Sequence, residues 1–413
     1  MPSNPRVLIL GLNFPPETTG IAPYAGSFAS GLAGRGIDVH VLTTYPHYPD
    51  WRFRGPLVRW THRECVEGVA VTRLRHYLPS KPEGVRRLLS EISFGARLLA
   101  ANWSRPDVVV LVSPALFSSA LAMLRARFSP RKPAVTVWVQ DLYSLGIREM
   151  GSGGGTVARA MRWMESMTLR AASRVVVIHS RFAAYVTDEL GVDADRVDVV
   201  RNWTHLGPTP TIDVGEVRNR HGWTPGETVV LHAGNMGVKQ GLENVIDAAR
   251  LASERSLPLK FVLLGNGNQR AALEEYGRDV DGLQFLSSLD DVGFQSALGS
   301  ADILLVNEKP GVSEMAVPSK LTSYFSSGRP VVAATDLSGV TAEEIRASVA
   351  GMVVQAGDPQ ALVDVCLQLR EDPEQASVLG ANGQRYRKDV LGQEPGIDLF
   401  AGILRTMASR QRR

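Results

Sequence analysis

Three glycines and a lysine follow an expected strand in the second half of the chain, in a pattern suited to holding phosphate. Gly234, Gly237, Lys239 and Gly241 come directly after the apolar run 228–232. Glycines let the backbone approach an anion closely, and a helix starting at Gly241 would turn free amide groups toward it. The spacing differs from the P-loop pattern G-x-x-x-x-G-K-[ST]. A glycine-rich turn beside a solvated lysine is the alternative.

A second lysine is expected in the first turn of a short helix. Pro318, Ser319 and Lys320 open this helix, which ends at Gly328 before the strand 330–333. A lysine is unfavourable at a helix N-terminus unless an anion offsets its repulsion with the helix dipole. A bound phosphate would supply that anion; otherwise Lys320 is an ordinary surface residue.

The first half of the chain offers a different kind of candidate. A loop beginning "GLNFPP" joins the expected strand 6–10 to the helix 22–33, and it lacks the G-x-G-x-x-G of a dinucleotide site. Asp141 and His179 follow the strands 134–139 and 174–178, at the edge where open parallel sheets bind ligands. We favour a functional role for Asp141 over that of a helix N-cap, whereas a histidine at a strand end is more often a structural hydrogen-bonding group.

Strands and helices alternate along the chain and would position these loops. Near-continuous Val, Ile and Leu runs predict strands buried on both faces of parallel sheets, and two series of β–α alternation predict two doubly wound α/β domains. Apolar periodicity lapses over the linker 199–215, where Pro, Thr and Gly accumulate. We expect domains at 1–203 and 204–390, and a final helical segment at 391–413. The other expected strands are 38–42, 69–74, 108–112, 259–264, 283–285, 303–306 and 352–354.

Composition bounds the function. The 413 residues exceed one ordinary core, and a net charge of +3 makes no case for nucleic acid. The chain has only two cysteines and no signal-peptide pattern, so a reducing cytoplasm fits best. The longest apolar run is interrupted by Ser113-Pro114. We therefore expect no membrane-spanning segment, and at most a contact with a membrane surface.

Several segments together resemble the family 4 glycosyltransferases of the GT-B fold, in particular the colanic-acid and exopolysaccharide subgroup. They are "HAGNMGVKQGLE", "VPSKLTSYFSSGRPVVAA", "NFPPETTGIAPYAGSFASGLAGRG", "VWVQDLYSLG" and "VVRNWT", which span about residues 7–335. The resemblance implies two Rossmann-like domains facing across a cleft, with the C-terminal helix packing back toward the first domain. It implies retaining, metal-independent transfer from a UDP-, GDP- or dTDP-sugar held by the second domain. The acceptor, a saccharide or a polyprenyl-linked saccharide, would lie in the first domain.

The resemblance also assigns roles to residues of this sequence. Gly20 would close over the donor phosphates, and Lys239 and Lys320 would neutralise the leaving diphosphate. Asp141, with Gln140, would orient acceptor or sugar hydroxyls. The other donor-side candidates are Gly234, Asn235, Gly237, Gly241, Pro318, Ser319 and Ser323, and the acceptor-side candidates are Asn13, Phe14, Pro15, Tyr24 and His179.

The sequence departs from the family pattern at several of these positions. Ser323 stands where many members carry the ribose-binding glutamate, and Glu314 lies out of register with the other glutamate of that motif. Asn235 replaces a common arginine, and Gln140-Asp141 stand where many relatives have a histidine. We expect the base and ribose near Leu286, Ser287, Ser288 and Glu308.

Metal-dependent chemistry is not favoured. The sequences 193–195 and 279–281 match the bare D-x-D motif of metal-dependent glycosyltransferases. That motif belongs at the end of a strand, where carboxylates and a diphosphate can share a metal. Both copies precede strands, so we interpret them as solvated loop acids and expect neither a metal nor another cofactor.

A basic, apolar helix in the first half raises the question of where the acceptor is carried. Segment 81–105 places Leu89, Ile92 and Trp103 beside Arg86, Arg87 and Arg97. A core-facing helix with a solvated basic face is the plainer interpretation; a surface for anionic lipid at the inner face of the cytoplasmic membrane is the sharper one. Two other functions stay open: a nucleotide-sugar 2-epimerase on the same scaffold, and a non-catalytic two-domain sugar-binding protein.

Overall fold

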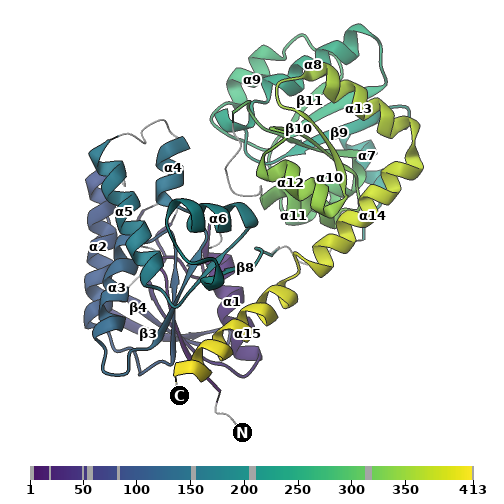
Figure 1. The fold of residues 1–413 in the computed structure, drawn as a ribbon. Helices are drawn as coiled ribbons and strands as arrows, with labels where there is room; N and C mark the ends of the chain where they lie inside the picture. Colours follow the sequence, from purple (N-terminus) through teal and green to yellow (C-terminus); the bar gives the residue numbers. More distant parts are fainter. Residues whose placement is uncertain are drawn as a thin grey trace. The chain divides into compact units, whose positions relative to one another are not determined.

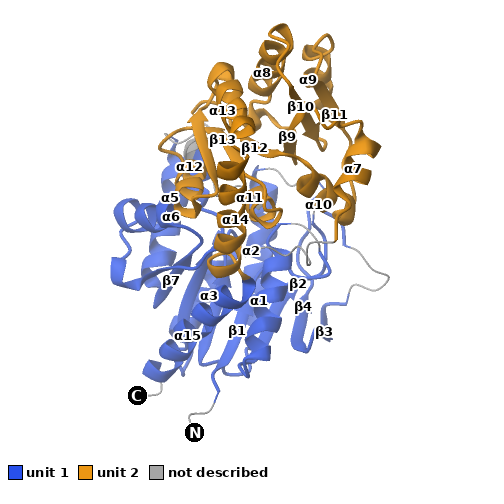
Figure 2. Ribbon diagram, turned by 90° about the vertical axis from the view of Figure 1, so that its right-hand side faces the viewer, with its two compact units in different colours: residues 1–205, 393–413 blue, residues 206–392 orange. Residues whose placement is uncertain are grey.

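The computed structural model describes residues 4–17, 20–48, 51–53, 59–80, 84–149, 155–203, 211–311 and 319–411. The chain divides into two units, coloured separately in Figure 2. Unit 1 comprises Met1–His205 and Gln393–Arg413, and unit 2 comprises Leu206–Gly392. The C-terminal segment therefore belongs with the N-terminal half of the chain.

Unit 1 is built on an eight-stranded sheet with the order β3-β4-β2-β1-β5-β6-β7-β8. All neighbours pair in parallel except β3 and β4, which are antiparallel. The strands are β1 (Arg6–Leu10), β2 (Asp38–Thr44), β3 (Thr61–Val66), β4 (Val69–Leu74), β5 (Val108–Val112), β6 (Ala134–Val139), β7 (Arg174–Val177) and β8 (Val197–Val199). The helices are α1 (Ala22–Gly34), α2 (Gly84–Ala100), α3 (Leu116–Phe128), α4 (Tyr143–Glu149), α5 (Thr156–Ala171), α6 (Ser180–Ala184), the π-helical turn Tyr185–Glu189, the 3₁₀ turn Ala194–Arg196 and α15 (Gln393–Gln411).

Both faces of this sheet are covered, as parallel strands require. One core contains Phe94 of α2, Met123 of α3 and Leu169 of α5 with one set of strand side chains. The other contains Phe28 of α1 and Phe400 of α15 with the alternate set. Figure 1 shows α2, α3 and α5 on one side of the unit, and α1 with α15 on the other.

The C-terminal helix α15 is an integral layer of unit 1. The rings of Phe400 and Phe28 lie 4.5 Å apart, and Phe400 also meets Trp138 edge-on. At the surface, Nε of Arg35 lies 2.6 Å from Asp398 and its Nη2 2.7 Å from Glu394. The resemblance to GT-B enzymes predicts such a returning helix, and the structure has it.

Unit 2 is a six-stranded, wholly parallel sheet with the order β11-β10-β9-β12-β13-β14. The strands are β9 (Thr228–Ala233), β10 (Leu259–Leu264), β11 (Leu283–Leu286), β12 (Ile303–Asn307), β13 (Val331–Thr335) and β14 (Gly351–Gln355). Helices on both faces enclose two cores. They are α7 (Val214–His221), α8 (Glu243–Glu254), α9 (Arg270–Tyr276), α10 (Asp291–Ser300), α11 (Ser319–Ser326), α12 (Val340–Ser348), α13 (Pro359–Glu371) and α14 (Pro373–Asp389), with the 3₁₀ turn Val238–Gln240 before α8.

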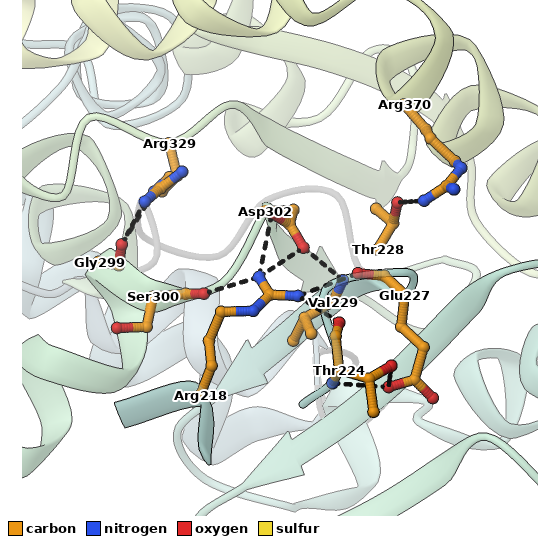
Figure 3. A network of polar contacts seen from close by, with 10 residues as sticks. All are labelled: Arg218, Thr224, Glu227, Thr228, Val229, Gly299, Ser300, Asp302, Arg329 and Arg370. Carbon is orange, nitrogen blue, oxygen red and sulfur yellow. Dashed lines mark hydrogen bonds and ion pairs between the residues drawn. The ribbon is translucent and has the colours of Figure 1, made fainter. Parts of the chain in front are cut away.

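An arginine network fastens the amino ends of the unit 2 strands (Figure 3). Arg218 of α7 donates to both carboxylate oxygens of Asp302, at 3.0 and 3.2 Å, and to the carbonyl oxygens of Ser300, Thr224 and Glu227. Asp302 in turn accepts a 2.7 Å bond from the amide of Val229 in β9. The network ties helix α7 to the sheet edge opposite the strand-end loops.

The sequence predicts every strand except β3 and β8, with ends shifted by at most two residues. The expected domain boundary near residue 203 lies close to the division at His205, and residues 204–210 lie outside the described residues. The glycine-rich loop 151–154 lies outside them as well. Two doubly wound units, one completed by the C-terminal helix, are the result.

Candidate active site

The loops after β9 and β10 in unit 2 pack so closely that only glycine fits. Gly234 and Gly265 have φ angles of +139° and +136°, which other residues rarely adopt. A Cβ atom at Gly265 would lie 2.0 Å from the carbonyl oxygen of Gly234, and one at Gly267 would lie 2.3 Å from that of Met236. Backbone hydrogen bonds from Gly234 to Leu264 and from Met236 to Asn266 join the loops. At Gly234, Gly265 and Gly267 the two loops therefore meet backbone against backbone at the carboxyl ends of these strands.

The helix after this loop begins later than the sequence analysis expects. Residues Val238–Gln240 form a 3₁₀ turn, Gly241 has a φ of +53°, and α8 starts at Glu243. A Cβ atom at Gly241 would lie 2.9 Å from the Cα of Lys309, so the glycine is required by close packing. The reason for the shift is Asn307, whose Nδ2 holds the carbonyl oxygens of Gln240 and Gly241 at 2.7 and 2.9 Å.

Two polar residues of this loop face outward. Asn235 and Lys239 have exposed side chains, whereas Gly237 is half-buried and its amide donates to the side chain of Gln240. The exposed lysine could reach an anion on the loop surface. Lys239 is therefore exposed to solvent, and water would screen its charge more than that of a half-buried group.

Lys320 of α11 reaches the same glycine loop from the neighbouring element. Its Nζ atom lies 3.4 Å from Nε2 of His232, and a Cβ atom at Gly234 would lie 3.6 Å from Nζ. Burial lowers the pKa of the Lys320 ammonium to about 8, and Glu308 opposes this shift. A half-buried, partly desolvated cation beside a glycine loop is a site that gains from a bound anion. Ser319 begins α11, its side chain is not described, and Pro318 lies outside the described residues.

The residues expected near the base and ribose lie at the ends of β11 and β12. Leu286 ends β11, and its carbonyl oxygen accepts from the amide of Gly265 at 2.9 Å. Ser287 is exposed, and the hydroxyl of Ser288 accepts from Asn266 at 3.1 Å. Glu308, after β12, accepts from the hydroxyls of Thr335 and Thr341. Its carboxylate is thus held in place one residue beyond the strand.

Ser323, at the position of the family's ribose glutamate, is half-buried on α11, one turn from Lys320. Its carbonyl oxygen accepts from Ser326 at 2.6 Å. A serine hydroxyl is shorter than a glutamate and carries no charge. Any ribose contact at this position would therefore differ from that of the family pattern.

Unit 1 has a pocket of about 490 Å³ at the carboxyl ends of its own strands. Its lining combines apolar side chains and aromatic rings with polar and charged groups. The lining residues are Leu12, Asn13, Gly20, Ile21, Tyr24, His47, Tyr48, Trp51, Arg87, Ser90, Glu91, Val112, Ser113, Pro114, Ala115, Gln140 and Asp141.

Gln140 and Asp141, predicted from the sequence, both line this pocket. The side-chain amides of Gln140 and Asn202 exchange two hydrogen bonds, of 3.0 and 2.7 Å. Asp141 is exposed, with one carboxylate oxygen 2.8 Å from the amide of Leu142. Its backbone carbonyl accepts from the hydroxyl of Ser113 at 2.8 Å. Gln140 is thus held by the chain, while Asp141 keeps a carboxylate at the surface of the pocket.

Glu91 and Arg87 of α2 also line the pocket, and sequence analysis misses their role. Glu91 is buried, accepts from the Tyr143 hydroxyl, and accepts from the amide of Phe117 at 3.3 Å. Desolvation raises the pKa of the Glu91 carboxyl. The Arg87 guanidinium lies 5.9 Å from the centre of the Tyr143 ring. The four-residue spacing of Arg87 and Glu91 was the available signal, because it places both on one helix face.

Some residues of the loop between β1 and α1 line the pocket. Asn13, Gly20 and Tyr24 are lining residues, and Nδ2 of Asn13 donates to Glu17 at 2.9 Å. The buried carboxylate of Glu17 also accepts from the amides of His47 and Tyr48, each at 2.7 Å. This carboxylate therefore fixes the loop against the chain after β2.

Three acceptor-side candidates lie outside the lining of this pocket. Phe14 is 3% exposed and packs in the core with Phe28, so it cannot contact an acceptor. Pro15 packs against Gly26, where a Cβ atom would lie 2.4 Å from its Cγ, and does not line the pocket. His179 is buried and caps α6, its Nδ1 accepting from the amide of Phe182 at 3.2 Å. Burial lowers the pKa of His179 to about 3.

The comparisons with known proteins now decide the family. Residues 19–203 match the glycosyl transferase 4-like domain, and residues 227–372 match the glycosyl transferases group 1 domain. WcaI of Escherichia coli (strain K12), named as a colanic acid biosynthesis glycosyl transferase, is 32% identical over 78% of this chain and 81% of WcaI. This chain is a family 4 glycosyltransferase.

Two further similarities place the glycosyltransferase among its relatives. A GDP-mannose-dependent phosphatidylinositol monomannoside mannosyltransferase of Corynebacterium glutamicum is 22% identical over 56% of this chain and 58% of that protein. HepE of Anabaena, solved with UDP, superposes with a TM-score of 0.69 at 14% identity, covering 97% of this chain and 100% of HepE. The fold of the glycosyltransferase is therefore GT-B.

The described residues show neither a cluster of metal ligands nor a membrane-spanning helix. No group of three or more His, Cys, Asp or Glu side chains there could hold a metal ion. None of the described helices is both long and apolar enough to cross a bilayer.

Proposed function

We propose that this glycosyltransferase moves a sugar, with retention of configuration and without a metal, from a nucleoside-diphosphate sugar to a saccharide or lipid-linked acceptor of cell-envelope glycan synthesis. Unit 2 would hold the donor and unit 1 the acceptor. The observation that carries the proposal is the half-buried Lys320 ammonium beside the glycine loop at Gly234. The relationship to WcaI supports the glycan class.

The donor assignment rests on complementary charge. A diphosphate needs cations and amide groups close to its oxygens, and the Gly234 loop lets an oxygen approach the backbone without steric hindrance. Lys239 supplies positive charge from the loop itself, and Lys320 supplies it from helix α11. HepE has been solved with UDP-glucose, and the Corynebacterium relative depends on GDP-mannose. Uridine and guanosine diphosphate sugars are therefore the first donors to screen, followed by dTDP-sugars.

The acceptor assignment rests on the unit 1 pocket. Carboxylates, an amide and a guanidinium converge there with aromatic rings, as a sugar with many hydroxyls requires. Asp141 offers an exposed carboxylate oxygen to an acceptor hydroxyl, and Gln140 is held beside it by Asn202. Positioning the hydroxyl on the face that the diphosphate leaves would produce retention, with the departing phosphate oxygen accepting the hydroxyl proton.

The cations give a route to leaving-group stabilisation without metal. Positive charge aimed at the departing diphosphate stabilises the transition state where negative charge develops. Activity should therefore survive excess EDTA, and the anomeric configuration of the product, read by NMR, should match that of the donor. Loss of activity on chelation with recovery on adding magnesium or manganese would contradict the metal-independent mechanism, and an inverted product would contradict retention.

One experiment separates transfer from the epimerase and binding alternatives. The protein is incubated with UDP-glucose or GDP-mannose, with and without an acceptor extract, and the released nucleoside diphosphate is measured. Transfer predicts release that depends on the acceptor. Isomerised sugar without acceptor would favour the epimerase, and binding without either product would favour a sugar-binding protein.

A lipid-linked acceptor would require the protein to meet a membrane surface. Helix α2 carries a stripe of exposed apolar side chains at helical spacing: Val85, Leu89, Ile92 and Leu99 are between 38% and 68% exposed. Arg86 is exposed on the same helix. Trp103 does not belong to this surface, because it is 6% exposed and packs in the core, and Arg97 stacks on Trp60 instead of extending into solvent.

Vesicle sedimentation tests this contact at the inner face of the cytoplasmic membrane. The protein should pellet with vesicles containing anionic lipid, remain in solution with neutral vesicles, and be released by moderate salt. Leu89→Gln with Ile92→Gln should weaken pelleting while turnover of a short water-soluble acceptor is retained. Equal recovery with anionic and neutral vesicles would contradict the contact.

A further inference from the structure

His232 is a buried residue at the end of β9 that the donor site does not otherwise explain. Its side chain is 0% exposed, and its Nδ1 lies 3.2 Å from the carbonyl oxygen of Leu305 in β12. A carbonyl oxygen only accepts hydrogen bonds, so Nδ1 carries the hydrogen of a neutral imidazole. The other nitrogen, Nε2, then carries the lone pair of the ring. Nε2 is the atom that faces the Lys320 ammonium at 3.4 Å.

The surroundings keep this imidazole neutral. Burial and the Lys320 charge hold the pKa of His232 well below its usual range, and the Leu305 and Asn235 backbone contacts oppose that shift only in part. The charged neighbour on the lysine side is Glu308, which acts to raise the pKa of Lys320. A neutral His232 can accept a hydrogen bond from the ammonium and leave its positive charge in place. A carboxylate at the same position would cancel that charge.

Helix α11 is itself fastened to the same strand end. Tyr324, one turn after Lys320, accepts from the amide of Ala233 at 2.8 Å and lies 3.2 and 3.3 Å from the carbonyl oxygens of Ala233 and Leu305. Tyr324 is fully buried, so these bonds fix the helix relative to β9. The Lys320 side chain is therefore anchored at its root by Tyr324 and at its tip by His232.

We propose that His232 is a positioning residue of the donor site: its Nε2 accepts a hydrogen bond from Lys320 and aims the ammonium at the Gly234 loop, where the donor diphosphate binds. The inference rests on the proposed donor site. It adds a role for a side chain that would not touch the donor and whose sequence position, inside an apolar strand, suggests only packing.

Paired substitutions at His232 test the role in the full-length protein. His232→Leu removes the acceptor at similar size, whereas His232→Gln places an amide oxygen near the former Nε2. Calorimetry with UDP and GDP, and with uridine and guanosine, should show diphosphate affinity about tenfold weaker in the Leu variant and largely recovered in the Gln variant. Nucleoside affinity should not change. The loss of diphosphate affinity at high pH should also begin at a lower pH in the Leu variant.

A matched control distinguishes positioning from general loosening of unit 2. Tyr386→Phe removes the hydroxyl that bonds Glu344 at 3.0 Å, on other elements of the same unit. It should lower the unfolding temperature without changing the ratio of diphosphate to nucleoside affinity. If His232→Leu leaves that ratio at the wild-type value, or Tyr386→Phe lowers it as much, the positioning role is wrong.

The tautomer can be read without any variant or nucleotide. Two-bond ¹⁵N–¹H NMR of the imidazoles should show His232 protonated at Nδ1 and unprotonated at Nε2 between pH 6 and 8. A proton on Nε2, or an imidazolium, would overturn the inference even if the Leu variant fails to fold. If Lys320→Met leaves UDP and GDP binding unchanged, the donor site itself is wrong; if only the His232 variants are without effect, the positioning role alone fails.

Discussion

The two ends of the unit 2 sheet each hold a half-buried cation, but they give it different partners. At the amino ends, Arg218 donates to Asp302 and to three carbonyl oxygens, and Asp302 also accepts from the backbone of β9 (Figure 3). At the carboxyl ends, the described residues give Lys320 one hydrogen-bonding partner, the neutral His232, and a more distant attraction from Glu308. Within the described residues, Arg218 thus has a carboxylate partner and Lys320 a neutral imidazole.

This difference indicates that Arg218 has a structural role and Lys320 a role in binding. Arg218 is surrounded by acceptors that the chain supplies, so its network stabilises the unit whether or not a ligand is bound. Lys320 carries a desolvation cost that nearby groups offset only in part, and an incoming diphosphate would supply the missing charge. Substitutions at the two ends should therefore change different measured quantities.

The largest expected effect is on turnover at the carboxyl end. Lys320→Met should lower kcat/KM at least about 100-fold, because charge-assisted contacts to a developing anion contribute roughly 3–4 kcal/mol to transition-state stabilisation. Steady-state assays with the donor identified by screening would measure it. Lys260→Met is the control, since Lys260 pairs with Glu227 at 3.6 Å near the other end of the strands and should leave kcat/KM unchanged.

A substitution at the amino end should change stability instead of turnover. Arg218→Ala should lower the free energy of unfolding by about 2 kcal/mol, because Asp302 and three carbonyl oxygens lose their donor. Part of Asp302 is solvent-exposed, which limits the cost. Urea unfolding would measure the loss. The folded variant should bind the donor with the affinity of the wild type. A selective loss of diphosphate binding would contradict the different roles of the two ends.

Diphosphate affinity should depend on pH through Lys320 at the carboxyl end of the sheet. The free protein loses the Lys320 proton near pH 8, whereas a bound diphosphate would hold that proton and raise the pKa. Affinity for UDP or GDP should be greatest below pH 8 and fall up to about tenfold per pH unit above it, with proton uptake on binding. Calorimetry in buffers of different ionisation enthalpy would detect the uptake. Proton release at pH 9 would contradict this sign.

The smallest effect is expected at Lys239. Its side chain is exposed, so water screens its contact with a phosphate. Lys239→Ala should weaken UDP or GDP binding about two- to fivefold, well below the effect of Lys320→Met. Titrations at low and moderate salt would separate the two, because the contribution of Lys239 should shrink as salt rises. If Lys239→Ala weakened diphosphate binding as much as Lys320→Met does, solvent exposure would not explain the relative contributions of the two lysines.

Most of the fold could be predicted from the sequence because parallel strands buried on both faces leave long apolar runs. Strand β3 was missed because its residues alternate between exposed and half-buried, as in an antiparallel edge strand that faces water on one side. Strand β8 has three residues and no apolar run. The start of α8 was misplaced because Asn307, more than 60 residues away, holds the carbonyl groups before it.

Residues of the candidate site could be predicted where they follow a strand end in the sequence. Gly234 and Lys320 have local signals, a glycine loop and a lysine at a helix start. Glu91 could not be recognised, since its partners Phe117 and Tyr143 are 26 and 52 residues distant and its helix has the pattern of a basic surface. Phe14 was assigned to the acceptor because its loop resembles a binding loop, yet its ring packs in the core.

Calorimetric titration of the wild type and Lys320→Met with UDP, GDP, uridine and guanosine tests the central claim most directly. The account predicts that Lys320→Met weakens the diphosphate that binds the wild type by about 10- to 100-fold and leaves the matching nucleoside unchanged. Equal affinity of wild type and variant for both diphosphates, or equal losses for diphosphate and nucleoside, would show that the Gly234 loop and Lys320 do not form a diphosphate site.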